Sequence, residues 1–335
     1  MFIAHSYPRA ALIGNPSDGY FGKCIAFVFS NFEAEVKAEI DDQWSVNTAQ
    51  KGLNSFANIN DFTKTIAEYG YYGGNPLMLA GLKVFFTYAN EKKINLPNSA
   101  LRITYQSNIP TRLGLAGSSA LITALFKVLI QWSGNKIEPA ILANLVLSVE
   151  KDELGIGAGL QDRVAQAYET PVFMDFNRES IHNKGFGQYE AINLKAIHDK
   201  IFIAYSPKLS EGSEKTHNKF RQDFESGELR VLSAIEKWKK MTTLFKDSVS
   251  TNEIQKLLEL INENFDLRNE LMELKKEQVD LVMMVRMLGA SAKFSGSGGA
   301  VIALAENQLD RDAIVKRLNA EGVEVIIPQI VYSQA

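Results

Sequence analysis

The apolar and polar residues in the N-terminal part of the chain predict mainly β-strands. Residues 34–40 alternate apolar side chains with acidic and basic ones, which is the pattern of a strand with one buried face. Residues 101–106 alternate in the same way, with the apolar side chains on one face and the polar ones on the other. Residues 10–14 and 24–31 are two further strand candidates.

Apolar residues at helical spacing occur both before and after the strand predicted at 101–106. The pair Asn75-Pro76 predicts the start of a helix over 77–88, because proline is favoured at the first helical position. Apolar residues at helical spacing predict a second helix over 121–132. Two more helices are expected over 139–150, which again opens on proline, and over 160–168.

Strand-like residues return after a boundary that we place near residue 195, which predicts two domains, 1–195 and 196–335. The second domain mixes strands with long helices, so the expected fold class is α+β, with two packed lobes and a cleft between them. Its predicted elements are strands at 201–204, 301–304 and 323–327 and helices at 232–238, 254–265, 279–288 and 314–318.

The composition is that of an ordinary globular enzyme and argues against several other classes. Of the 335 residues, 46% are hydrophobic and 22% are charged, and the net charge of −3 argues against nucleic-acid binding by phosphate neutralisation. The single cysteine, Cys24, excludes an internal disulfide and fits a reducing compartment. No apolar run is long enough to span a bilayer, and residues 1–9 do not resemble a signal peptide, so we expect a cytoplasmic protein with no membrane partner. The four histidines show no metal-ligand spacing.

The segment 110–120, Pro-Thr-Arg-Leu-Gly-Leu-Ala-Gly-Ser-Ser-Ala, is the clearest candidate for chemistry. It connects the strand at 101–106 to the helix at 121–132, so its glycines and two serines lie at a helix N-terminus. Free backbone N–H groups and the positive end of the helix dipole meet there and make an anion site. Glycines also let the backbone approach a phosphate closely. The segment is neither a Walker A motif nor a G-x-G-x-x-G fingerprint, and taken alone it equally fits a capped helix after a tight turn.

Three further motifs accompany this loop. A segment with a basic residue begins at Arg9, Glu150 and Asp162 form an acidic pair, and a second glycine loop, Lys-Phe-Ser-Gly-Ser-Gly-Gly, occupies 293–299 before a predicted strand. Along the chain, the basic segment comes first, followed by the 110–120 loop, the acidic pair and the second glycine loop. Motifs of these four kinds in this order resemble the GHMP kinase superfamily, which includes galactokinase, homoserine kinase and mevalonate kinase. The resemblance spans nearly the whole chain. It implies a two-lobed fold with an N-terminal domain like the second domain of ribosomal protein S5 and a ferredoxin-like C-terminal domain.

The resemblance also implies an ATP-dependent kinase that uses Mg²⁺. Phosphoryl transfer needs charge neutralisation, alignment and deprotonation of the attacking hydroxyl. Asp162 is then the candidate base, and Arg9 is the cation that stabilises the transferring phosphoryl group. Ser119 and Glu150 would bind the Mg²⁺ ion, which prefers oxygen ligands. The triphosphate would be held by the loop residues Gly114, Leu115, Ala116, Gly117, Ser118, Ser119 and Ala120.

Without the resemblance, each of these side chains has an ordinary structural interpretation. Glu150 would be a solvated acid at a helix end, next to the acidic residues Asp152 and Glu153. Asp162 would be a first-turn residue favoured by the helix dipole. Arg9 would be a surface charge.

Shorter segments narrow the resemblance within the superfamily. Segments 14–18, 70–74, 159–166 and 264–268 are similar to those of glucuronokinases, which phosphorylate D-glucuronate at its anomeric carbon. The implied partner is a small-molecule uronate, with no nucleic acid, and the expected assembly is a monomer or a homodimer. The alternatives are another acceptor, such as galactose or a heptose phosphate, and a catalytically silent sugar sensor on the same fold.

Residues expected to contact the sugar come from both predicted domains. Asp18 would bind sugar hydroxyls, as the matching acid does in galactokinases, and Tyr72 would line the pocket. A uronate also needs a cation for its carboxylate, and arginine matches the two oxygens best. Arg268 is the first candidate, Arg163 the second and Arg112 the third. The second glycine loop would close on the substrate through Ser295, Gly296, Ser297 and Gly298.

Overall fold

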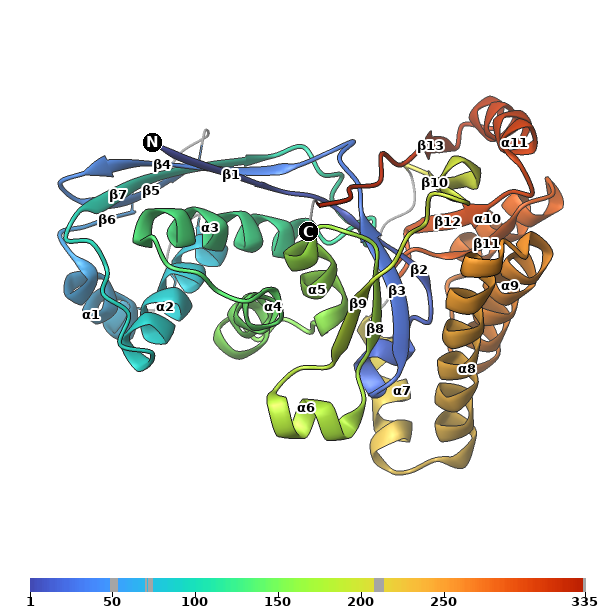
Figure 1. Ribbon diagram of the computed structural model, residues 1–335, viewed down its shortest axis with the longest axis horizontal. Helices are drawn as coiled ribbons and strands as arrows, with labels where there is room; N and C mark the ends of the chain where they lie inside the picture. Colours follow the sequence, from blue (N-terminus) through green and yellow to red (C-terminus); the bar gives the residue numbers. More distant parts are fainter. Residues whose placement is uncertain (49–53, 70, 72–74, 208–213, 334–335) are drawn as a thin grey trace. The chain divides into compact units, whose positions relative to one another are not determined.

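The computed structural model describes residues 1–48, 54–69, 71, 75–207 and 214–333 (Figure 1). Two compact units are interleaved along the chain. Unit 1 comprises Met1–Pro8, Phe32–Ile109 and Ala116–Ala167. Unit 2 comprises Arg9–Asn31, Pro110–Leu115 and Tyr168–Ala335. Unit 2 therefore includes two short segments from the N-terminal half of the chain, 9–31 and 110–115. The domain boundary near residue 195 stays a prediction.

Unit 1 is built on a five-stranded sheet with strand order β1-β4-β7-β5-β6. Its strands are β1 (Phe2–Ser6), β4 (Ala34–Asp41), β5 (Trp44–Thr48), β6 (Asn54–Phe56) and β7 (Ala100–Ser107). The strands β5 and β7 are parallel, and the other pairs are antiparallel.

The register of β4 against β7 confirms the alternation predicted for both strands. Val36 lies opposite Tyr105 and Ala38 opposite Ile103, so the apolar side chains of the two strands share one face. The exception is Ile40, which the pattern placed on the buried face and which is 63% exposed near the end of its strand.

Helices of unit 1 lie on the side of the sheet that carries this apolar face (Figure 1). They are α1 (Ile59–Tyr69), α2 (Pro76–Glu91), α3 (Gly117–Ser133), α4 (Pro139–Ser148) and α5 (Leu160–Tyr168). The helix α3 packs on β1 and β4, and α2 and α4 pack on α3 (Figure 1). The rings of Phe86 and Trp132 meet Trp44 edge to face, with centroids 5.2 and 5.3 Å away, and close one end of the core.

Unit 2 contains two four-stranded antiparallel sheets. The first has the order β2-β3-β8-β9, with β2 (Arg9–Ile13), β3 (Lys23–Val28), β8 (Val172–Asp175) and β9 (Gln188–Ala191). The second has the order β11-β12-β10-β13, with β10 (Ile201–Tyr205), β11 (Ser291–Phe294), β12 (Ala300–Leu304) and β13 (Glu324–Ile326).

The helices of unit 2 are α6 (Arg178–Lys184), α7 (Glu214–Glu225), α8 (Leu229–Thr251), α9 (Ile254–Leu271), α10 (Lys276–Met287) and α11 (Gln308–Ala320). The long helices α8 and α9 lie side by side (Figure 1), and both contact β2. The sequence pattern found the apolar part of α8 but not α7, because α7 is mostly polar and charged and its only apolar residues are Phe220 and Phe224. The mixture of helices with mainly antiparallel sheets confirms the α+β class.

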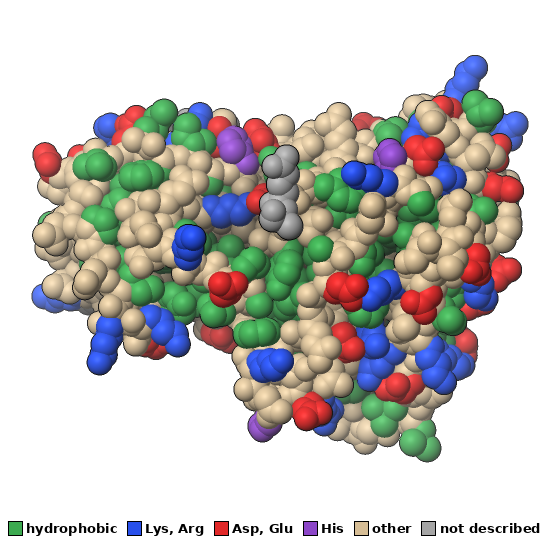
Figure 2. All heavy atoms as spheres, in the orientation of Figure 1, with side chains coloured by type: hydrophobic (Ala, Val, Ile, Leu, Met, Phe, Trp, Pro, Cys, Tyr) green, Lys and Arg blue, Asp and Glu red, His purple; other side chains and the backbone are tan. Residues whose placement is uncertain are grey.

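None of the helices described is long and apolar enough to cross a membrane. On the face that Figure 2 displays, acidic and basic side chains are interspersed, and the described residues there form no continuous basic stripe. This distribution agrees with the net charge of −3.

Candidate active site

Glu150 is buried in unit 1 at a turn of π-helix. The helix α4 passes directly into this wider turn, Val149–Glu153, and such turns are frequent at functional sites. The Glu150 side chain is 1% exposed, whereas its neighbours Lys151 and Asp152 are exposed. The alternative interpretation of Glu150 as a solvated acid is therefore wrong.

Both carboxylate oxygens of Glu150 have partners from other elements. The Ser118 hydroxyl, in the first turn of α3, donates to Oε1 at 2.7 Å. The Arg163 guanidinium, on α5, donates to Oε2 through Nε at 2.8 Å and also through Nη2. Because Arg163 is 5% exposed, this is a buried ion pair whose hydrogen bonds offset the desolvation of both charges.

Arg163 also reaches the second acid of the predicted pair. Its Nη1 atom donates to Asp162 Oδ2 at 3.2 Å and to the Gly159 carbonyl at 2.9 Å. Asp162 lies in the first turn of α5, as its dipole-favoured interpretation required. One guanidinium thus links the candidate metal ligand to the candidate base.

The first turn of α3 keeps the features expected of an anion site. The helix begins at Gly117, and the residue before it, Ala116, has a left-handed backbone with φ 62°. No side chain caps this helix, so the N–H groups of its first turn are available to an anion. The Ser119 hydroxyl donates to the Ala116 carbonyl at 3.1 Å, so Ser118 and not Ser119 lies against Glu150.

In unit 2, the first residues of the predicted phosphate-binding loop, which we call the phosphate loop (residues 114–120), pack against the second glycine loop. A Cβ atom on Gly114 would lie 2.8 Å from the Gly298 carbonyl oxygen, and one on Gly296 would lie 2.5 Å from the Gly114 carbonyl oxygen. Gly114 and Gly298 also have positive φ, +66° and +150°, which disfavours other residues. Glycine is therefore required here for close approach of the two backbones.

The strand β2 joins these two loops through Arg9. Its backbone N–H donates to the Leu115 carbonyl at 3.0 Å, and its Nη1 atom donates to the Ser295 carbonyl at 2.6 Å. Arg9 is 4% exposed, so the alternative interpretation of Arg9 as a surface charge is wrong.

Arg268, on α9, forms hydrogen bonds to the backbone of the second glycine loop. Its Nη1 and Nη2 atoms donate to the carbonyls of Gly296 and Ser297 at 2.9 and 3.0 Å. Burial lowers the pKa of Arg268 to about 10, against the opposing fields of Asp18 and Tyr20. Arg268 therefore has a positioning role that the sequence did not reveal.

Lys293 is a buried cation that the sequence motif contained but for which no role was predicted. It is 1% exposed, and its Nζ atom donates to the carbonyls of Ala11 and Phe294 at 2.9 and 2.8 Å. Burial and the positive charges of Arg268 and Arg9 lower its pKa well below the ordinary value. Within the described residues, neither Lys293 nor Arg268 forms an ion pair, so unit 2 holds buried positive charge suited to an anion.

Asp18, Tyr72 and Arg112 are the remaining residues considered for sugar binding. Asp18 lies in a short 3₁₀ turn, Ser17–Tyr20, and its negative charge partly opposes the lowering of the pKa of Arg268 and of Lys293 by burial. Tyr72 lies outside the described residues. Arg112 is exposed and has a left-handed backbone with φ 60°.

The segment 264–268 carries a second anchor that the sequence did not predict, Asn264. Its Oδ1 atom accepts from the Gly14 N–H at 2.6 Å, and its Nδ2 atom donates to the Asn15 carbonyl at 2.9 Å. One helix face thereby fixes both the turn that carries Asp18 and, through Arg268, the second glycine loop.

The oxygen donors of unit 1 fit a magnesium ion. Mg²⁺ is usually held by one or two carboxylates together with substrate phosphates and water. Glu150 and Ser118 provide a carboxylate and a hydroxyl at one place, 2.7 Å apart. The described residues contain no group of three or more His, Cys, Asp or Glu side chains that would hold a metal by themselves. The donor set therefore fits an ion completed by phosphate oxygens rather than an all-protein site.

Known proteins resemble this chain in both sequence and fold. The GHMP kinases N terminal domain matches residues 81–170, and the GHMP kinases C terminal domain matches residues 245–324. Glucuronokinase 1 of Arabidopsis thaliana is 35% identical over 303 residues, which cover 89% of this chain and 83% of that protein. The chain belongs to the GHMP kinase family.

Two further comparisons support the same placement of this GHMP kinase. Probable glucuronokinase 2 of Arabidopsis thaliana is 35% identical over 309 residues, which cover 90% of this chain and 84% of that protein. The crystal structure of Lactococcus lactis galactokinase complexed with galactose superposes with a TM-score of 0.77 at 16% identity, covering 100% of this chain and 94% of that one. The two-domain GHMP kinase fold expected from the motifs is confirmed.

Proposed function

We propose that this GHMP kinase transfers the γ-phosphoryl group of ATP to the anomeric hydroxyl of D-glucuronate and releases glucuronate 1-phosphate. The observation that carries the acceptor is the 35% identity, over about nine tenths of the chain, to two proteins named as glucuronokinases. A silent sugar sensor is disfavoured because Glu150 and Asp162 are both present and are linked by one buried arginine.

The triphosphate binds at the phosphate loop, Gly114 to Ala120, where backbone N–H groups and the start of α3 favour negative charge. Glu150 together with a serine hydroxyl would hold Mg²⁺, and the contact at 2.7 Å supports Ser118 more than the predicted Ser119. When bound, Mg²⁺ neutralises phosphate charge and orients the triphosphate.

Asp162 accepts the proton of the attacking hydroxyl. Its Oδ2 atom is held by Arg163 at 3.2 Å, which fixes the orientation of the carboxylate. Arg9 stabilises the negative charge of the transferring phosphoryl group, a task for which a permanently charged guanidinium is suited.

Recognition of the uronate carboxylate falls to unit 2. Of the two arginines predicted for this role, Arg163 is already paired with two carboxylates, whereas Arg268 donates only to neutral carbonyls, which favours Arg268 as the partner of a further carboxylate. Arg268 and Lys293 supply buried positive charge beside Asp18, Ser295, Gly296, Ser297 and Gly298, the residues predicted to contact the sugar.

The test is a kinase assay with ATP, Mg²⁺ and a panel of uronic acids, neutral hexoses and heptose phosphates. We expect glucuronate to be phosphorylated with the highest efficiency, and ³¹P NMR to identify an anomeric phosphate. Preference for a neutral hexose would refute the glucuronate assignment, and absence of ATP turnover with every acceptor would favour the sensor. The assembly, monomer or homodimer, and the cytoplasmic location stay predictions.

A further inference from the structure

A cavity of about 890 Å³ lies in unit 2 outside the residues assigned to catalysis and substrate binding. Its walls are the end of the Ser17–Tyr20 turn, the start of β3, the segment from β8 into α6, and one face each of α7 and α8. A volume of this size is typical of small-molecule sites.

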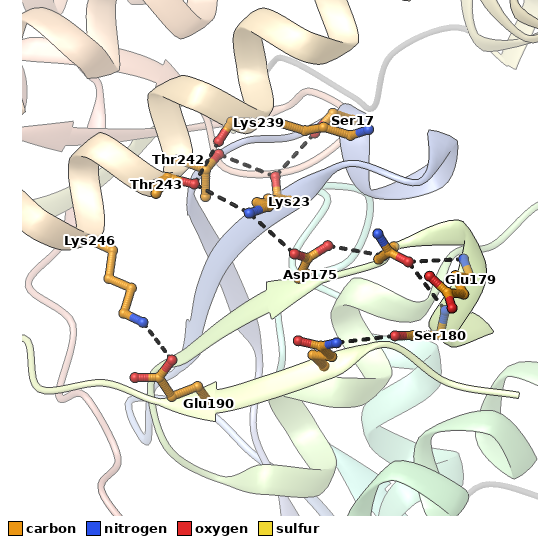
Figure 3. A network of polar contacts seen from close by, with 12 residues as sticks. Ser17, Lys23, Asp175, Glu179, Ser180, Glu190, Lys239, Thr242, Thr243 and Lys246 are labelled. Atoms are coloured by element: carbon orange, nitrogen blue, oxygen red, sulfur yellow. Dashed lines mark hydrogen bonds and ion pairs between the residues drawn. The ribbon is translucent and has the colours of Figure 1, made fainter. Parts of the chain in front are cut away.

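The floor of the cavity is a fixed polar network (Figure 3). The Lys23 amine lies between β8 and α8, 3.2 Å from Asp175 Oδ2 and 3.5 Å from the Thr243 hydroxyl. Asp175 also accepts from the Asn177 N–H at 3.0 Å. Asp175 is therefore neutralised within the floor and adds no net repulsion toward an anion.

The walls of the cavity carry an excess of positive charge. The lining contains four cationic residues and two acidic ones, a difference of two: Lys23, Arg178, Lys239 and Lys240 against Asp175 and Glu236. Glu236 is paired with Lys239 at 2.7 Å, in the same way as Asp175 is paired with Lys23. The excess therefore resides on Arg178 and Lys240.

Arg178 and Lys240 come from different walls of the cavity. Neither forms an ion pair within the described residues. The Arg178 guanidinium lies over the Phe21 ring, 4.5 Å from its centroid, so its position is fixed by stacking rather than by an acid. Two cations in one cavity suit a phosphomonoester, which carries a charge of about −1.5 to −2 at pH 7.

Apolar side chains line the cavity beside these cations. Leu232 and Leu244 on α8 line the cavity together with Phe224 and Ile235. These two leucines are 37% and 48% exposed. Exposed leucines next to unpaired cations suit a ligand with an apolar ring as well as a phosphate, because the ring removes the leucine surface from water. Inorganic phosphate would leave that surface uncovered.

We propose that this cavity binds a nucleoside monophosphate at a second site, with the phosphate between Arg178 and Lys240 and the base against the apolar wall of α7 and α8. The ligand class follows from the combination of two cations, aromatic and leucine side chains, and a volume of about 890 Å³. The site does not depend on the identity of the sugar acceptor.

The test is isothermal titration calorimetry of the full chain with UMP, in the presence and absence of saturating ATP. We expect UMP to bind in both conditions, and uridine and inorganic phosphate to bind at least about tenfold more weakly, because each lacks one half of the recognised chemistry. Binding of inorganic phosphate as tight as that of UMP would refute the proposal, as would displacement of UMP by ATP.

Variants locate the binding in the cavity. The pair Arg178→Gln and Lys240→Gln, combined in one chain, should raise the Kd for UMP by about tenfold or more and leave sugar-kinase turnover unchanged. Lys237→Gln is the matched control, because Lys237 is an exposed residue of α8 that does not line the cavity. Equal Kd values for the double variant, the control and the unmodified chain would place UMP elsewhere and overturn the assignment.

Discussion

Arg163 and Glu150 form an ion pair in which two nitrogens of the guanidinium, Nε and Nη2, donate to the same carboxylate oxygen. Both side chains are buried, at 5% and 1% exposed. The charge of Glu150 is therefore neutralised from within unit 1 by Arg163. A cation that binds Glu150 must either displace Arg163 from the carboxylate or bind the carboxylate together with Arg163.

Arg163→Gln should destabilise the protein in a way that Mg²⁺ partly reverses. Removing one partner of a buried pair leaves the other charge uncompensated, which costs about 3–5 kcal/mol in the free energy of unfolding. We expect Mg²⁺ to stabilise this variant more than the unmodified chain, because the ion then neutralises Glu150. Urea unfolding with and without Mg²⁺ measures both effects.

The double variant Arg163→Gln with Glu150→Gln is the control for that experiment. It removes both charges, so most of the lost stability should return and the response to Mg²⁺ should disappear. A double variant as unstable as the single one would show that Arg163 acts through its contacts with Gly159 or Asp162 instead.

Asp162→Asn should lower turnover by about 10²–10⁴-fold, the usual effect of losing a positioned general base. The substitution is nearly isosteric, so folding and nucleotide affinity should persist. Turnover is measured under saturating ATP and glucuronate, and nucleotide affinity by calorimetry. Near-normal turnover would mean that Asp162 is not the base or that the hydroxyl needs none.

Glu150→Gln should raise the Mg²⁺ concentration required for half-maximal activity. Asp152→Asn is the matched control, because it removes the same charge from an exposed residue two positions away. We expect no comparable change in the control, and activity is titrated with Mg²⁺ at fixed ATP for both variants. Equal shifts at the two positions would argue for general electrostatics rather than for Glu150 as a ligand.

Arg268→Ala should reduce the preference for glucuronate over glucose by about tenfold or more. A charge-assisted hydrogen bond to a carboxylate contributes about 1.5–3 kcal/mol, and a neutral sugar does not use it. The ratio of kcat/KM for the two sugars is the readout. If efficiency falls equally for both sugars, Arg268 acts by holding the carbonyls of Gly296 and Ser297 and not by binding the carboxylate.

Lys293 should make stability rise with pH in the alkaline range. Its pKa in the folded state is lowered by burial and by Arg268 and Arg9, well below the ordinary value of 10.5. Between these two pKa values the unfolded chain binds more protons than the folded chain, so the free energy of unfolding increases as pH rises toward 10.5.

Lys293→Met should remove this rise, and urea unfolding at several alkaline pH values measures it. The exposed residue Lys237 provides the control, since Lys237→Met should keep the pH dependence of the unmodified chain. An unchanged slope in Lys293→Met would assign the pH dependence to other groups.

Much of the fold could be predicted from residues that are close together in the sequence. The alternation over 34–40 and 101–106 predicted two strands, and their register in the sheet brings the predicted apolar faces together. Proline marked the starts of the helices α2 and α4 at residues 76 and 139. These predictions succeed because hydrophobic period and helix-start signals depend on residues that are close in the chain. The phosphate-binding loop was predicted in the same way, from glycines and serines at the start of one helix, and its role stays a prediction.

The tertiary structure alone decided which side chains meet. Ser118 and Ser119 are equivalent in sequence terms, yet Ser118 lies on Glu150 and Ser119 on its own backbone. Arg268 and Arg163 were the first and second candidates for a carboxylate partner, but Arg163 binds two acids of unit 1 and Arg268 binds two carbonyls of unit 2. The sequence specifies the chemical types and their local spacing. Burial and pairing depend on distances between elements far apart in the chain, which exist only once the elements have packed.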